Sequence, residues 1–128
     1  MEMPELIAEW VKYSKTDLDV AKQLFENMHP RPLEIICYQS QQSAEKILKA
    51  FLIQNDIQPP KTHDLYRLCK ICEGVDVSFN DIAVLFGSLN KYGVQPRYPF
   101  EIEILETDAE SAIQKAADIF EWVSQKLR

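Results

Sequence analysis

Residues 33–55 read LEIICYQSQQSAEKILKAFLIQN, and this segment decides the class of fold. Its apolar and small side chains recur every three or four positions, so they share one face of a helix. Prolines at positions 30, 32, 59 and 60 flank the segment, and proline ends a helix because it lacks the backbone N–H. We therefore expect one helix over residues 33–55. Its inner face comprises Leu33, Ile36, Cys37, Ser40, Ala44, Ile47, Leu48, Phe51 and Leu52.

The same helical periodicity continues on both sides of this segment. It predicts a long helix over residues 4–28, short helices over about 62–74 and 78–89, and a long last helix from residue 107 onward. Residues 92–99 form a predicted loop, and residues 100–104 are interpreted as an extended linker. The sequence thus predicts a single all-α domain over residues 1–128, an up-and-down helical bundle of about five helices, three long and two short.

Short motifs indicate where the later helices begin. Thr62 is a good N-cap residue, since its hydroxyl can accept a backbone N–H. Ser78 with Asp81, and Thr107 with Glu110, have the spacing of a capping box. We expect the third, fourth and last helices to start at these residues.

The charge balance excludes several classes of function. The 128 residues include 14 Lys and Arg against 20 Asp and Glu, a net charge of −6. Broad nucleic-acid binding needs many basic residues, so only a local basic groove stays possible. With 3 glycines, no glycine-rich phosphate loop can form, and HExxH and GxSxG are absent. The chain has no membrane-length apolar run and no signal peptide, so we expect a cytoplasmic protein with reduced cysteines.

Polar side chains form a second face of the second predicted helix: Tyr38, Gln42, Glu45, Lys46 and Lys49. Residues three or four apart on a helix are neighbours, so these side chains lie together. The face is either solvated, with contacts from Gln42 to Lys46 and from Glu45 to Lys49, or a ligand site. Its shared orientation alone does not separate the two interpretations.

Further candidates lie outside the second predicted helix. Asp17 falls within the apolar stripe of the first helix, where we expect it to accept hydrogen bonds from a neighbouring helix, the alternative being catalysis. Residues 62–65 are either a plain helix start or an anion site in which His63 joins the helix N-terminus. Arg97 can bind phosphate and Tyr98 can stack on a base, or Arg97 pairs with a surface acid.

Cys69 and Cys72 form a CxxC motif. Structural zinc usually needs about four ligands, and no second cysteine pair exists. Both cysteines fall on the apolar face of the third predicted helix. We expect them to pack in the core, and we predict no metal site.

Four of these pieces, taken in order, resemble the HEPN domain (higher eukaryotes and prokaryotes nucleotide-binding), and in particular its small stand-alone bacterial and archaeal members. The pieces are Trp10 with Asp17, Leu18 and Ala21, then residues 37–50, residues 62–65 and residues 97–99. The resemblance covers nearly the whole chain and implies an up-and-down helical bundle. The matching polar positions are Asp17, Gln42, Glu45, Lys46, Lys49, His63, Asp64, Arg97 and Tyr98.

The resemblance also implies functions. Many members look like partners of a minimal nucleotidyltransferase encoded beside them, often as a toxin–antitoxin pair, while others bind nucleotides, and many form dimers. One branch consists of ribonucleases that use an arginine followed by four to six residues and a histidine. No histidine follows Arg31, Arg67 or Arg97 at that spacing. We therefore lean towards a non-enzymatic role.

The favoured hypothesis is a nucleotide-binding or partner-binding module, with ATP or GTP as the candidate ligand. The ligand-binding candidates are Lys46, Lys49, His63, Arg97 and Tyr98, with Asp17, Gln42, Glu45 and Asp64 as supporting polar residues. We expect Lys46, His63, Arg97 and Tyr98 to meet in one cleft. The alternatives are an RNA-directed toxin or ribonuclease with a divergent site, and a purely structural dimeric interaction bundle.

A homodimer is also expected. The first two helices carry apolar residues beyond a single stripe, including Ile7, Val11, Ile35 and Ile53. Extra apolar surface on a small bundle often marks an interface between copies.

Overall fold

The computed structural model describes residues 2–93 and 103–128. In these residues the chain forms α1 (Met3–Asn27), α2 (Leu33–Gln54), α3 (Leu65–Glu73) and α4 (Glu106–Ser124), with two 3-10 helices, η1 (Val77–Phe86) and η2 (Asn90–Tyr92), between α3 and α4. The predicted all-α bundle of three long and two short helices is confirmed, with η2 as an additional single turn. No described helix is both long and apolar enough to cross a membrane.

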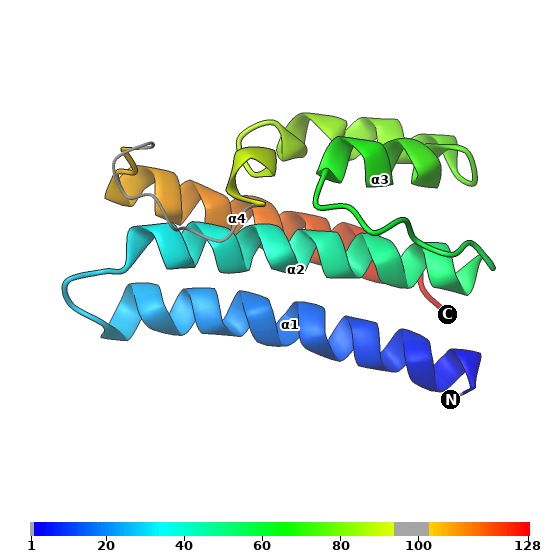
Figure 1. Cartoon of the computed structure of the whole chain (residues 1–128), viewed down its shortest axis with the longest axis horizontal. Coiled ribbons are helices and arrows are strands. Elements are labelled where there is room, and N and C mark those ends of the chain that lie inside the picture. Colours follow the sequence, from blue (N-terminus) through cyan, green and yellow to red (C-terminus); the bar gives the residue numbers. More distant parts are fainter. Residues whose placement is uncertain (1, 94–102) are drawn as a thin grey trace.

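Helix α2 lies at the centre of the bundle (Figure 1). Helix α1 runs antiparallel along one side of it, α4 packs behind it, and α3 with η1 forms a layer on the side away from α1. Most α2 side chains are therefore buried, including several polar ones: Ser40, Gln41, Gln42, Ser43 and Glu45. Burying an unpaired polar group is costly, so these side chains need partners inside the protein.

The core under η1 is built around Phe79. Its ring centroid lies 4.5 Å from that of Phe51 on α2 and 4.9 Å from that of Trp122 on α4. Cys69 and Cys72 are buried on the inner face of α3, as predicted. Burial raises the pKa of Cys69 to about 11 and that of Cys72 further, so both thiols stay protonated at neutral pH. In the part of the chain that the structure describes, no three potential metal ligands cluster.

Carboxylates cap two helices where hydroxyl groups were predicted to do so. Asp64 accepts two backbone N–H groups of the first turn of α3, at 3.0 and 3.3 Å. Helix α3 therefore begins after Asp64, and the prediction of Thr62 as its N-cap is wrong. Asp76 caps η1 by accepting the N–H of Ser78 at 3.0 Å, so the predicted start at Ser78 is wrong as well. The carboxylate is a charged acceptor for these N–H groups, while the Thr62 hydroxyl instead accepts the backbone N–H of Asp64 at 3.1 Å.

Helix α4 begins slightly earlier than predicted. The carboxylate of Asp108 accepts the backbone N–H of Leu105 at 2.9 Å, so the helix begins before Thr107. The helix ends before Lys126, whose ammonium forms a 2.8 Å ion pair with Asp76. Hydrogen bonding to the Lys126 ammonium is the main reason that the pKa of Asp76 falls to about 2. This pair joins the end of the chain to the start of η1.

The element over Val77–Phe86 is a 3-10 helix, whereas the periodicity predicted an ordinary helix. Its β-branched residues, including Val77, Ile82 and Val84, have lower α-helix propensity because they lose χ1 freedom. One side of this element still faces the core, since Phe79, Ile82 and Phe86 are buried.

Candidate functional site

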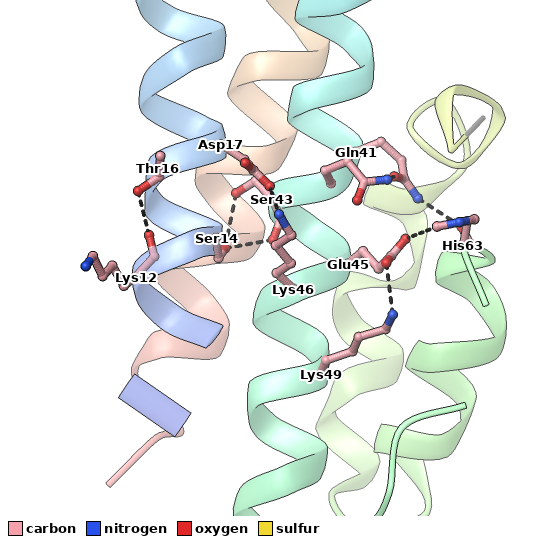
Figure 2. Close-up of polar contacts among 11 residues, drawn as sticks. Lys12, Ser14, Thr16, Asp17, Gln41, Ser43, Glu45, Lys46, Lys49 and His63 are labelled. Carbon is pink, nitrogen blue, oxygen red and sulfur yellow. Dashed lines mark hydrogen bonds and ion pairs between the residues drawn. The ribbon is translucent and has the colours of Figure 1, made fainter. Parts of the chain in front are cut away.

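Glu45, in the middle of α2, is the centre of the polar site (Figure 2). Its Oε1 lies 2.8 Å from Nδ1 of His63, and its Oε2 lies 2.9 Å from Nζ of Lys49. The exposed fraction of the side chain is 5% for Glu45, 12% for Lys49 and 63% for His63. The predicted contact between Glu45 and Lys49 is confirmed. The interpretation of this face as solvated is wrong, because the carboxylate is buried.

The buried carboxylate orients the imidazole ring of His63. A carboxylate only accepts hydrogen bonds, so Nδ1 is the donor in this contact. Nε2 is then an acceptor in the neutral ring and a donor in the protonated ring. The exposed ring can therefore take a proton from a ligand or donate a hydrogen bond to an anion.

Two glutamines hold the main chain beside this ring. Gln41 Nε2 donates to the carbonyl oxygen of His63 at 2.9 Å, and Gln42 Nε2 donates to Gln41 Oε1 at 3.0 Å. A Cβ on Gly93 would lie 3.0 Å from both Gln41 Nε2 and that carbonyl oxygen, so the close approach requires glycine. Gln41 was not among the predicted candidates. Its signal in the sequence is its place next to the apolar stripe, where an amide must find an internal partner.

A second ion pair ties α1 to α2. Lys46 Nζ donates to Asp17 Oδ2 at 2.7 Å, and nearby Ser14 Oγ donates to the carbonyl oxygen of Ser43 at 2.7 Å. The expectation that Asp17 accepts a hydrogen bond from a neighbouring helix is confirmed. Figure 2 shows Lys46 turned towards α1, with His63 beyond Glu45 on the other side of α2. The structure therefore does not bring Lys46 and His63 into contact.

The N-terminus of α3 is not an anion site. Asp64 occupies two of its backbone N–H groups, and Asn90 Oδ1 accepts a third, from Leu65, at 2.7 Å. Asn90 also donates to Asp64 at 3.0 Å. The prediction that these backbone donors would hold a phosphate is wrong, because they are already bonded and because the carboxylate of Asp64 repels an anion there.

Two predicted site residues, Arg97 and Tyr98, lie outside the described residues, so their role stays a prediction. The expected linker over residues 100–104 falls partly outside as well, and its described residues, 103 and 104, form neither helix nor strand. Gly93, the last residue described before 103, is buried beside His63.

A surface groove adjoins Lys49. It consists of two hollows of about 530 Å³ each, which share Leu6 and Trp10 of α1. Lys49 lines the first hollow and Lys46 the second. The ring centroid of Trp10 lies 5.8 Å from Lys49 Nζ. Trp10 was not predicted as a site residue, although it belongs to the first of the four motifs that carry the family resemblance.

The fold and the Glu45 centre define a small helical-bundle domain whose central helix carries the polar site. A family model of the HEPN domain matches residues 7–127, so the chain belongs to the HEPN domain family. It is similar to the crystal structure of ST0689, an archaeal HEPN homologue, with 26% identity over 95% of this chain and 98% of that chain and a TM-score of 0.74. It is also similar to the crystal structure of TT1696 from Thermus thermophilus, with 25% identity, coverage of 94% and 98%, and a TM-score of 0.77. No curated protein sequence matches the chain.

Proposed function

We propose that the chain is a nucleotide-binding module and that a phosphate group binds at the exposed edge of His63. The observation that carries this proposal is the buried carboxylate of Glu45, which contacts both the exposed imidazole and Lys49. When the ring is protonated, this contact directs Nε2–H outwards, towards solvent and an incoming anion. The ring is already oriented, so little side-chain entropy is lost when a ligand binds.

The local charges favour a small ligand over a polymer. Lys46 and Lys49 each pair with a carboxylate, so the region is close to neutral, and the chain as a whole carries −6. Long-range attraction of a polyanion is therefore weak, and binding depends on short, directed hydrogen bonds. This balance supports ATP or GTP as the ligand.

Replacing His63 by alanine should weaken ATP and GTP binding by roughly ten- to hundredfold, the effect of losing a hydrogen bond to a charged group. Isothermal titration calorimetry measures the two dissociation constants. His29→Ala is the matched control, because His29 is the other histidine of the chain and lies exposed in the turn between α1 and α2. Equal binding by wild type and His63→Ala, or binding by neither, would contradict the proposal.

The contact between Glu45 and His63 also favours a second candidate, metal-independent RNA cleavage. A histidine with one ring nitrogen hydrogen-bonded to a carboxylate is a typical general base through its other nitrogen. Here Glu45 holds Nδ1, so the base would be Nε2. The same variants separate the two functions when they are incubated with single-stranded RNA. RNA cleavage by wild type and by His29→Ala, and none by His63→Ala, would favour the ribonuclease over the binding module.

The family resemblance supports a partner for this module. We propose that the partner is a minimal nucleotidyltransferase, that the two act as a toxin–antitoxin pair, and that both are cytoplasmic. The three buried, unpaired cysteines are consistent with a reducing compartment. Co-expression of the chain with the product of its neighbouring gene, followed by affinity purification, tests the pairing.

We also propose a homodimer, formed across a groove between α1 and α4. Ile7, Val11 and Lys12 line this groove. Glu5 precedes them on α1, so an antiparallel second copy would place Glu5 of each chain opposite Lys12 of the other, in an isologous interface. Two other residues were expected in the dimer interface. Ile35 is exposed but lies outside this groove. Ile53 is buried in the core of the single chain, so its prediction as an interface residue is wrong.

Light scattering at micromolar concentration should give a mass about twice the 14.9 kDa of one chain. Val11→Lys should reduce it to the monomer value, because a charge would be buried in the apolar centre of the interface. Val84→Lys is the control, since Val84 is exposed on η1, away from α1. A monomeric wild type would rule out this dimer.

A further inference from the structure

The first hollow of the groove at Trp10 has the composition of a small-molecule site. Its walls are mainly apolar and include Trp10, Ile53, Ile57 and Pro59. Two cations, Lys49 and Lys61, line it as well. Its volume of about 530 Å³ falls within the range of roughly 300–1,000 Å³ typical of ligand pockets. A ligand that matches this lining has a flat apolar part and an anionic part.

Lys49 connects this hollow to the polar centre on α2. Its ammonium group lies 2.9 Å from the Glu45 carboxylate, which in turn holds His63, and 5.8 Å from the Trp10 ring centroid. A group bound against Trp10 is therefore next to the charged network described above. No other side chain in the described residues lines the hollow and also contacts Glu45.

We propose that the hollow receives the base of a nucleotide, which stacks on the indole ring of Trp10 while its phosphates extend past Lys49 towards the exposed edge of His63. This inference rests on the proposed nucleotide binding and locates the base within it. Asp56 also lines the hollow, and its carboxylate offers an acceptor for an exocyclic amine such as that of adenine. The negative charges of Asp56 and of Glu9, which lines the second hollow, repel a long polyanion. The ligand is therefore a single nucleotide.

The test compares ATP with inorganic tripolyphosphate, which lacks the base, by calorimetry on the full chain. When alanine replaces an aromatic side chain on which a base stacks, the affinity for the nucleotide falls by roughly 5- to 150-fold. Trp10→Ala should therefore weaken ATP binding by that factor and leave tripolyphosphate binding unchanged. Trp10→Phe keeps an aromatic face and should retain most of the affinity for ATP. Melting temperatures of both variants check that they are folded.

A fluorescence measurement reports on the hollow directly. In a Trp122→Phe background, Trp10 is the single tryptophan of the chain, and ATP should quench its emission while tripolyphosphate should not. If tripolyphosphate binds as tightly as ATP and the Trp10 variants change neither, the base site is wrong and the phosphate site of the proposed function stands. If neither compound binds, the proposed function fails and the base site fails with it.

Discussion

Glu45→Ala should lower the free energy of unfolding by about 3–5 kcal/mol, the range for removing one partner of a buried ion pair. The substitution leaves the ammonium of Lys49, which is mostly buried, without its carboxylate. It also frees the His63 ring, which is exposed and can be hydrated instead. The destabilisation therefore comes mainly from the uncompensated charge of Lys49. Urea denaturation followed by circular dichroism measures it.

Two controls test whether the destabilisation comes from the buried charge of Lys49 or from the loss of any ion pair on a helix. Lys15 and Asp19 form an ion pair with the same spacing of four, at 2.6 Å, but both side chains are half-exposed. Asp19→Ala should cost less than about 0.5 kcal/mol, because a surface pair contributes little. The double variant Glu45→Leu with Lys49→Leu should recover much of the lost stability, since it removes both buried charges. A double variant as unstable as Glu45→Ala would contradict this explanation.

Phe79→Ala should destabilise the fold by about 3–5 kcal/mol, as expected when a large buried aromatic side chain leaves a cavity. The Phe79 ring is fully buried and touches the rings of both Phe51 and Trp122. Its loss therefore removes a contact that η1 makes with two long helices at once. The thermal unfolding midpoint and the urea midpoint should both fall.

Val77→Ala on the same 3-10 helix is the matched control. Val77 is 79% exposed, so its truncation should change stability by no more than about 0.5 kcal/mol. A small effect of Phe79→Ala, comparable to that of Val77→Ala, would show that η1 contributes little to the core.

The fold was predictable because helical periodicity is a local property. The stripe over residues 33–55 fixed α2 to within one residue, and the apolar faces of α1 and α3 followed from the same spacing. The exact helix starts were less predictable. Near the starts of α3 and η1, a hydroxyl residue and an aspartate lie two positions apart, and the aspartate makes the cap. At the start of α4, Asp108 instead accepts the backbone N–H of the N-cap residue, Leu105. Residue type alone ranks these caps as nearly equal.

The candidate site was only partly predictable, because the burial of Glu45 depends on segments that are distant in the sequence. Spacing identified Glu45 and Lys49 as neighbours but left open whether their face was solvated. That face is buried because the chain that follows α2 returns over it and places His63 at Glu45. The partner of Asp17 was predicted only as a neighbouring helix. Local sequence spacing does not predict which face of a helix will be covered by a segment that comes later in the chain.

The polar contacts between α1 and α2 have a consequence for the relative alignment of these helices. Two antiparallel helices with apolar stripes can also pack after a slide of one turn, about 5.4 Å, with much of their apolar contact retained. A slide of that size would separate the Ser14 hydroxyl from the Ser43 carbonyl and Asp17 from Lys46. These contacts make a single register the favourable one. A chimera that takes α1 from a relative should therefore keep its proper register only if it carries a small hydroxyl at position 14 and an acid at position 17.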